Sequence, residues 1–402
     1  MSKKLPEGWE KANLKDYINV METGKRPKGG AISDGIPSLG GEHINYNGQL
    51  NISLDKMKFI PEEYYESLKS GKIEIGDILI VKDGATTGKV GIVKDSFPFE
   101  KACINEHLFR LRSNEYLYQK YLYYYLRSDK GQYSILKDFR GATVGGISKG
   151  FINMDIVLPP LEEQKRIVSI LEKAEKAIQK RKESNKLLDE LVKSRFIEMF
   201  GELKTNENNF EIVNLEQLTT KITDGVHCKP EYTSEGIPFI SVKDINKGKL
   251  NFSECKYISK EAHEKYIKRC NPEFGDILYT KVGATYGIPA VVDTNEEFSL
   301  YVSVALLKLK NDYVNPIYIK EALRSIDIKR QADRQVKGIG VPDLHLVEIK
   351  KFKIFNPPIE LQNQFADFVK QVDKLKFRLE ISLKKLESNF NSLMQKAFNG
   401  EL

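Results

Sequence analysis

One glycine-rich segment of this chain has residue types that could hold a phosphate group. Gly84-Ala-Thr-Thr-Gly-Lys89 approaches the phosphate-binding P-loop, in which four residues separate the glycines and Ser or Thr follows the lysine. Here only three residues separate the glycines, and Val90 follows the lysine. The second half of the chain holds a similar segment, Gly283-Ala-Thr-Tyr-Gly-Ile288, which lacks the lysine. We therefore predict tight turns between strands here and no nucleotide site.

The other candidates for catalysis or metal binding are weaker. Asn356-Pro-Pro-Ile359 approaches the Asn-Pro-Pro-aromatic motif of amino-methyltransferases, but its last residue is not aromatic, and a helix start explains it better. The spacing does not fit structural zinc, whose ligands come in pairs two to four residues apart. The conceivable zinc ligands are His227, Cys228, Cys255, His263 and Cys270. We expect no catalytic residue, resident cofactor or metal in this chain.

Basic and polar loops are more informative, because they recur beside the same turns in both halves of the chain. Lys and Arg can neutralise phosphates, and Arg, Asn, Gln or Thr can read base edges. The plain alternative is that each is an ordinary surface residue. The DNA-binding candidates are Lys25, Arg26, Lys28, Lys82, Thr86, Thr87, Lys89, Arg140, His227, Lys229, Tyr232, Lys281, Thr285, Tyr286 and Lys337.

The blocks of sequence that flank these loops occur twice in the chain. Gly-Ile-Pro recurs at residues 35 and 236, Gly-Asp-Ile-Leu at 76 and 275, and Gly-Ala-Thr at 84 and 283. Leu-Arg-Ser recurs at 126 and 323, and a Pro-Pro pair at 159 and 357. The order is kept and the offset stays between 197 and 201, which shows an internal duplication. Between the matched blocks the loops at 21–34 and 222–235 differ, so the two halves should bind different things.

Each copy ends in a long stretch without Gly or Pro, over 161–200 and 359–398. Apolar residues at alternating spacings of three and four predict two coiled-coil helices, most simply packed on each other in antiparallel fashion around a pseudo-twofold axis. The alternative is that each helix packs on its own globular part. The predicted seam consists of Ile167, Ile170, Ala174, Leu188, Val192, Phe196, Phe365, Phe368, Val372, Leu375, Leu379, Leu386, Phe390 and Leu393.

The globular parts are predicted to be α+β, each with a small curved mixed sheet and short helices. The predicted domains are 1–160, the helix 161–201, 202–358 and the helix 359–402. No stretch approaches the ~20 apolar residues of a membrane span, and no apolar core follows the basic N-terminus, so the cytoplasm is the expected location. The net charge of +7 permits a nucleic-acid partner without demanding one.

These blocks together resemble the specificity subunit of type I restriction–modification enzymes over essentially the whole chain. The resemblance is carried by Leu5-Pro-Glu-Gly-Trp9, by the repeated Gly-Ile-Pro, Gly-Asp-Ile-Leu and Gly-Ala-Thr blocks, and above all by the openings of the two helices. Those openings read Leu158-Pro-Pro-Leu-Glu-Glu-Gln164 and Pro357-Pro-Ile-Glu-Leu-Gln362.

The resemblance implies two target-recognition domains that each read half of a bipartite, asymmetric site in double-stranded DNA, with the helix pair as the spacer. It implies two modification subunits that carry S-adenosylmethionine and methylate adenine N6, and restriction subunits, where present, that use ATP and Mg²⁺. A different interpretation keeps the coiled coil but makes the chain a protein–protein scaffold without DNA readout. An autonomous nucleotide-dependent enzyme is the third and remotest option.

Overall fold

Each half of the chain folds around a four-stranded antiparallel sheet. The computed structural model describes residues 5–53, 57–137, 139–141, 145–246, 248–310, 312–338 and 340–402. In the first half the strand order is β2-β8-β5-β6. These strands are β2 (Ile18–Thr23), β8 (Leu108–Ser113), β5 (Ile78–Val81) and β6 (Val90–Ile92). All four residues of β5 are buried, as expected for the central strand that follows the Gly-Asp turn.

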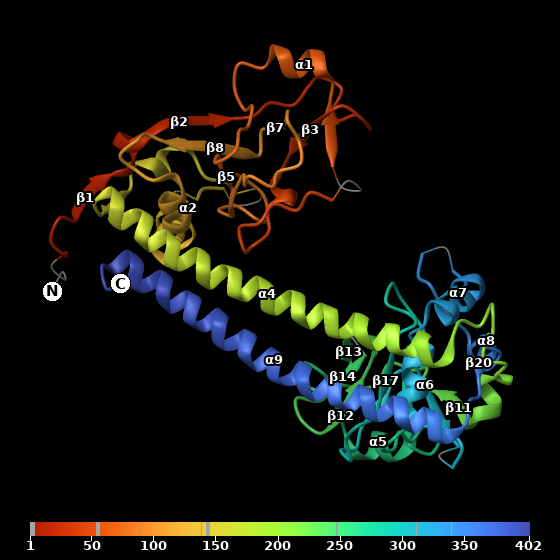
Figure 1. Ribbon diagram of the computed structural model, residues 1–402. Coiled ribbons are helices and arrows are strands. Elements are labelled where there is room, and N and C mark those ends of the chain that lie inside the picture. Colours follow the sequence, from red (N-terminus) through yellow and green to blue (C-terminus); the bar gives the residue numbers. More distant parts are fainter. Residues whose placement is uncertain are drawn as a thin grey trace. The chain divides into compact units, whose positions relative to one another are not determined.

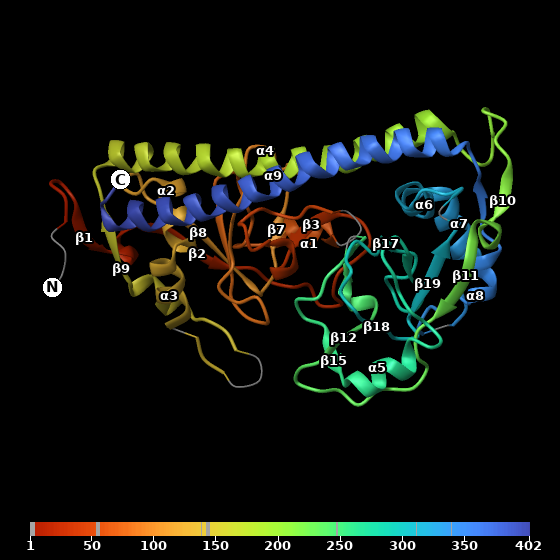
Figure 2. The same ribbon diagram turned by 90° about the horizontal axis from the view of Figure 1, so that it is seen from below.

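The second half repeats this sheet with the order β11-β19-β16-β17. Its strands are β11 (Thr219–Asp224), β19 (Val304–Leu309), β16 (Ile277–Thr280) and β17 (Pro289–Val291). In Figure 2, β11 and β19 lie side by side next to the short helices of the same half. The predicted duplication is therefore confirmed at the level of strand order and register.

A smaller mixed sheet accompanies each large one. In the first half, β3 (Ile36–Leu39) pairs antiparallel with β4 (Lys58–Ile60) and parallel with β7 (Cys103–Ile104). In the second half, β12 (Ile237–Ile240) pairs in the same way with β15 (Lys256–Ile258) and β18 (Ser299–Leu300). The predicted α+β class with a small mixed sheet is confirmed.

Short elements complete each half. Two-stranded ladders join β1 (Glu10–Asn13) to β9 (Asp155–Leu158) and β10 (Ile212–Asn214) to β20 (Lys353–Phe355). The second half adds a hairpin of β13 (Ile245–Asn246) and β14 (Lys249–Leu250). The short helices are α1 (Glu62–Ser67), α2 (Gln119–Arg127), α3 (Asp129–Lys137), α5 (Lys260–Tyr266), α6 (Pro316–Leu323), α7 (Ile326–Gln335) and α8 (Leu346–Lys350).

Two long helices, α4 (Leu161–Phe200) and α9 (Ile359–Asn399), begin directly after the Pro-Pro pairs. Figure 1 shows them side by side and running in opposite directions. Each ends at a glycine in the left-handed region, Gly201 at φ 75° and Gly400 at φ 71°. Glycine adopts this conformation without the steric penalty that a Cβ brings, which explains why both helices stop there.

The chain divides into two compact units, and each unit takes part of both long helices. The first unit is 1–181 with 382–402, and the second is 182–381. Within the first, Ile167 and Leu171 of α4 share a core cluster with Met394 and Phe398 of α9 and with α2. Within the second, Val192 and Phe200 share a cluster with Phe365 and Val372. Each helix thus packs both on its partner helix and on a globular part.

The predicted seam is wrong at Leu375, which is 46% exposed. The next residue takes the seam position instead, because Lys376 Nζ lies 2.5 Å from Asp189 Oδ1 of α4. Two turns earlier, Val369 is more deeply buried than the predicted seam residue Phe368. Of the other predicted seam residues, four besides Phe365 are buried: Ile167, Val192, Val372 and Phe390. The rest are half-buried: Ile170, Ala174, Leu188, Phe196, Phe368, Leu379, Leu386 and Leu393.

A buried glutamine ties the first turn of each long helix to its unit. Gln164 Nε2 donates to the carbonyls of Pro159 and Tyr116 at 2.9 and 3.1 Å, and its Oε1 accepts from the Tyr118 amide at 2.7 Å. Gln362 repeats this arrangement with Pro357, Tyr313 and Asn315 at 2.8, 3.3 and 2.9 Å. The Pro-Pro-x-x-x-Gln pattern is therefore a device that fixes where and in which direction each helix leaves its globular part.

Candidate nucleic-acid interface

The loops that carry the predicted DNA-binding residues meet on one scaffold in the first unit. The turn at Gly84 is held by a hydrogen bond from its amide to the Gly145 carbonyl at 3.2 Å. Lys82, just before this turn, donates its amide to His107 O at 2.8 Å and accepts from the Ile147 amide at 2.8 Å. The turn between β5 and β6, the loop before β8 and the segment after α3 are thus joined through backbone hydrogen bonds.

The second unit joins the equivalent loops in the same way. Gly283 donates to Pro342 O at 2.8 Å, and Lys281 donates to Ser303 O at 2.9 Å and accepts from Leu344 at 2.8 Å. Because backbone bonds carry the arrangement, the side chains on these loops can change without disturbing it. Such a surface, constant in backbone and variable in side chains, suits recognition of different sequences.

The candidates of the first unit lie on or beside this scaffold. Lys25, Arg26, Lys28 and Arg140 are exposed, and Lys82, Thr86, Thr87 and Lys89 are half-buried. Lys89 Nζ lies 3.7 Å from the centre of the exposed Tyr46 ring. Thr87 Oγ1 donates to Gly84 O at 2.7 Å and closes the turn, so this side chain has a structural role. The predicted glycine-rich loop after Arg140 lies partly outside the described residues, at 142–144.

Most of the DNA-binding candidates of the second unit are exposed to solvent. His227, Lys229, Tyr232, Thr285 and Lys337 are exposed. Tyr286 instead folds against α7, where its hydroxyl lies 2.5 Å from Asp333 Oδ1 and Lys329 Nζ lies 3.7 Å from its ring centre. Beside Tyr232 is a hollow of about 580 Å³ with aromatic walls that include Phe239 and Tyr301. The glycine-rich loop after Lys337 contains residue 339, which lies outside the described residues.

The prediction that Lys281 offers its charge to DNA is wrong. Its side chain is only 6% exposed, and Nζ lies 3.6 Å from Asp224 Oδ2 and 3.4 Å from Asp343 Oδ1. Asp224 is itself 3% exposed, so the lysine neutralises a buried carboxylate. Lys82, the equivalent residue of the first unit, donates to Glu106 O at 3.0 Å. The recurrence of this lysine therefore reflects the scaffold.

Sequence reasoning missed several charged side chains that contact the candidates. In the first unit, Glu106 and His107 contact Arg26: Glu106 Oε1 lies 3.0 Å from its Nε and His107 Nε2 lies 3.3 Å from its NH2. Asp83 contacts Lys82, with Oδ2 3.5 Å from Nζ. In the second, Asp224 Oδ1 lies 2.6 Å from Arg269 NH2. Arg269 follows α5 in a segment without a repeated block, so no signal in the sequence singled it out.

The described residues do not bring the candidate catalytic or metal-binding side chains together. The conceivable zinc ligands do not gather, since Cys255 and Cys270 belong to an apolar cluster and His263 Nδ1 lies 2.9 Å from Ser299 Oγ. Within the described part of the chain, no three His, Cys, Asp or Glu side chains are placed to hold a metal ion. Gly146-Ile-Ser148-Lys-Gly150 has nucleophile-elbow spacing, but Ser148 Oγ accepts from the Gly150 amide at 3.0 Å and caps a 3-10 helix.

The cysteines provide a chemical test of the exposed loop in the second unit. Cys228 is exposed, whereas Cys103, Cys255 and Cys270 are buried. Burial raises the pKa of Cys103 to about 11 and that of Cys270 to about 12, so both thiols stay protonated and unreactive at pH 8. We expect one fast-reacting thiol per native chain with Ellman's reagent, and four after unfolding in urea. A second fast thiol, or a fast thiol that persists in Cys228→Ser, would contradict this assignment.

Among the helices of the described residues, none combines the length and the apolar character that crossing a membrane requires.

Comparison with known proteins now adds to the geometry. The family model described as "Type I restriction modification DNA specificity domain" matches the chain twice, at residues 6–189 and 207–387. The type I restriction enzyme MjaVIII specificity subunit of Methanocaldococcus jannaschii is 23% identical, over 96% of this chain and 90% of that protein. The type I restriction enzyme EcoKI specificity subunit of Escherichia coli K12 is 22% identical, over 99% and 90%.

Solved structures with the same fold include a chain from a study of complex assembly and conformational transition of the type I R-M system. It has a TM-score of 0.62 and 18% identity, with 100% of both chains covered. The crystal structure of the type I restriction-modification S subunit from M. genitalium has a TM-score of 0.54 and 15% identity, covering 99% of this chain and 98% of that one. Since the family model covers most of the sequence in two consecutive copies, the chain belongs to the type I restriction modification DNA specificity domain family.

Proposed function

We propose that this chain is the DNA sequence-specificity subunit of a type I restriction–modification enzyme, in which each unit reads one half of a bipartite, asymmetric site. One observation carries the proposal. The two units hold the same loops with the same backbone hydrogen bonds but place different side chains on them. The first unit has Arg26, Asp83 and His107 at the positions where the second unit has His227, Val282 and Ser303. Different donors and acceptors on one scaffold are what readout of two different base sequences requires.

The remaining parts of the proposal follow the family. The paired helices set the spacer between the half-sites and dock two modification subunits, which methylate adenine N6. S-adenosylmethionine is assigned to those subunits, and ATP and Mg²⁺ to restriction subunits where a host has them. This chain supplies recognition and no reacting group, and the complex works in the cytoplasm.

Exchange of one loop tests the proposal. Residues 25–34 lie between two glycines that the backbone requires: a Cβ on Gly24 would lie 1.7 Å from Ile104 O, and Gly35 has φ 138°. Replacing 25–34 with the same loop of a relative of different specificity should change one half-site and leave the other intact. The measurement is methylome sequencing of cells that hold the variant and its modification subunits.

The second unit provides the matched control for this exchange. Gly225 and Gly236 anchor residues 226–235 in the same way, with a Cβ on Gly225 placed 1.9 Å from Leu300 O and Gly236 at φ 137°. Exchange of 226–235 should change the opposite half-site. Unchanged motifs in both experiments, with normal assembly of the complex, would argue for the scaffold interpretation and against direct DNA readout.

A further inference from the structure

Each unit presents an exposed arginine that is held by a carboxylate and a histidine. In the first unit, Arg26 Nε lies 3.0 Å from Glu106 Oε1, and its NH2 lies 3.3 Å from His107 Nε2. His107 is anchored in turn, because its Nδ1 lies 2.5 Å from Asp83 Oδ1. The Arg26 side chain nevertheless remains 50% exposed. Glu106 and His107 therefore orient the guanidinium, while half of the side chain remains accessible to a ligand.

The second unit builds the same group from other residues. Arg269 NH2 lies 2.6 Å from Asp224 Oδ1 and 3.2 Å from His227 Nε2. His227 Nε2 lies 3.2 Å from the same Asp224 oxygen. Asp224 is buried and Arg269 is 54% exposed, so this arginine is held through NH2 while much of its side chain stays open to solvent.

The two groups are not copies of each other. Arg26 and His227 occupy equivalent positions, each two residues after the glycine that follows β2 or β11. The first unit thus takes its arginine from this loop and its histidine from the loop before β8, whereas the second takes its histidine from this loop and its arginine from the segment after α5. Because a shared scaffold would keep the residues in place, the recurrence of the group in a rearranged form points to a shared task.

The charges of each group favour a base over a phosphate as the ligand. In the first unit, Arg26 pairs with Glu106 and Lys82 with Asp83. In the second unit, Arg269 pairs with Asp224 and Lys281 with Asp343. Each group is therefore close to neutral, which removes most of the attraction for a phosphate. Its hydrogen-bond donors remain, since NH1 of either arginine has no partner among the residues that the structure describes.

We propose that Arg26 and Arg269 each read a guanine, through O6 and N7 in the major groove, in the half-site of their own unit. A fork of guanidinium N–H donors matches these two acceptors, and this is the commonest specific contact of arginine with DNA. The carboxylates fix the fork before DNA arrives and so lower the entropic cost of binding. The inference rests on the proposed function and adds to it the base class and the residue that reads it.

The test replaces each arginine with lysine, which keeps the charge but loses the planar fork. Complexes with Arg26→Lys or Arg269→Lys and the modification subunits are assayed on duplexes in which every position of both half-sites is varied. We expect preference for guanine to fall by roughly 5- to 150-fold at one position of one half-site, a different half-site for each variant, with the other positions unchanged.

Lys28→Gln and Lys229→Gln are the matched controls, since these exposed lysines occupy equivalent positions in the same loops. If they contact phosphates, they should weaken binding to all sequences alike and lower the salt slope by about one. The same uniform loss in an Arg→Lys variant, an unchanged preference, or a half-site without guanine would overturn the inference. Parent complexes that methylate without sequence preference would instead overturn the proposed function itself.

Discussion

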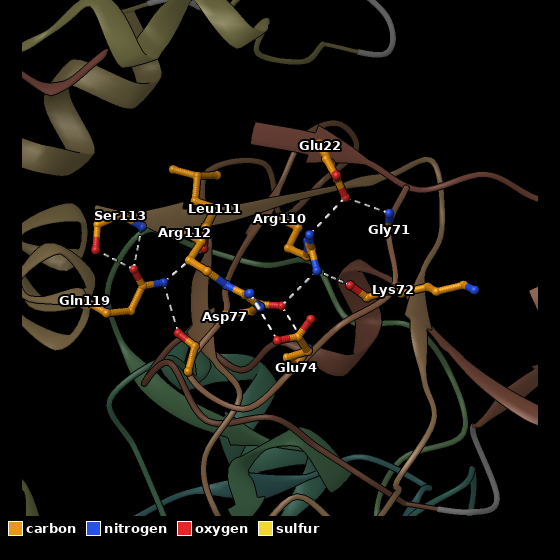
Figure 3. Close-up of polar contacts among 11 residues, drawn as sticks. Glu22, Gly71, Lys72, Glu74, Asp77, Arg110, Leu111, Arg112, Ser113 and Gln119 are labelled. Carbon is orange, nitrogen blue, oxygen red and sulfur yellow. Dashed lines mark hydrogen bonds and ion pairs between the residues drawn. The ribbon is translucent and has the colours of Figure 1, made fainter. Parts of the chain in front are cut away.

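Replacing Arg110 with leucine should lower the free energy of unfolding by about 3 kcal/mol, because it removes one partner of a nearly buried ion-pair network. Figure 3 shows the network. Arg110 lies on β8, with NH2 3.1 Å from Glu22 Oε2 and NH1 3.3 Å from Asp77 Oδ2, and it also donates to the Lys72 carbonyl. Without the guanidinium, the hydrogen bond from the Gly71 amide is the one contact left to the Glu22 carboxylate among the described residues.

Adding Glu22→Thr should recover most of this loss, because the second unit contains that solution already. Register pairs Glu22 with Arg110 in the first sheet and Thr223 with Leu306 in the second. Leu306 is fully buried and Thr223 is 8% exposed. Asp276, the counterpart of Asp77, keeps Lys308 at 2.9 Å, as Asp77 keeps Arg112 at 2.7 Å. Buried ion pairs replaced by well-packed apolar residues often cost little.

Urea-induced unfolding of the four chains of a double-mutant cycle provides the measurement, and hydrogen exchange of β5 and β8 assigns the loss to the first unit. We expect a coupling energy of about 2 kcal/mol between positions 22 and 110. Lys308→Arg in the second unit is the matched control and should change stability by less than about 0.5 kcal/mol. A double variant as unstable as Arg110→Leu would show that shape at this position, and not the unpaired carboxylate, sets the cost.

The features that could be predicted from the sequence are those that stereochemistry ties to one residue. The Pro-Pro pairs mark the starts of both long helices and the glycines after them mark the ends, because proline suits a first turn and glycine suits the left-handed terminus. Repetition of short blocks at a nearly constant offset then predicted the two copies of the scaffold. Such signals are local, so one sequence is enough to find them.

Features that depend on a partner far along the chain could not be predicted. The phase of the α9 seam is one example, since Leu375 and Lys376 both fit alternating spacings and Asp189 on the other helix decides between them. Lys281 is another example, because its ammonium group pairs with Asp224 and Asp343, which lie far from it in the sequence. Arg269 reaches the candidate interface through a contact that no spacing encodes.

Removing one heptad from each long helix should abolish methylation at the native site while leaving both units folded. The matched deletions are 179–185 in α4 and 379–385 in α9, which preserve the Asp189–Lys376 pair. They join the seam positions Ile178 and Leu188 in α4, and Lys376 and Leu386 in α9, at a spacing of three. Seven residues shorten a helix by about 10 Å, close to the length of three base pairs. Under the proposed function the half-sites would then be engaged at a shorter separation.

Rotation makes this change severe. A heptad turns a straight helix by only about 20° short of two full turns, whereas three base pairs turn the duplex by about 100°. Under the proposed function, shortening the helices would bring the two DNA-binding loops closer together by about three base pairs. It would not rotate one loop relative to the other by the ~100° that separates base pairs three steps apart in the duplex. Methylation assays on duplexes with systematically varied spacers should show no product at the native spacer and unchanged base preferences within any half-site that is still engaged.

Deletion of 179–185 alone is the control that separates spacing from folding. Because α4 has 40 residues and α9 has 41, this deletion leaves α9 eight residues longer than α4. Some apolar seam residues of α9 then lose their contacts on α4, and thermal stability should fall. The matched pair of deletions restores the apolar contacts between the two helices. It should therefore restore thermal stability, but not methylation at the native spacer. Full methylation there by the doubly shortened chain would mean that the helices do not set the spacer, and that the loops alone determine which bipartite sites are read.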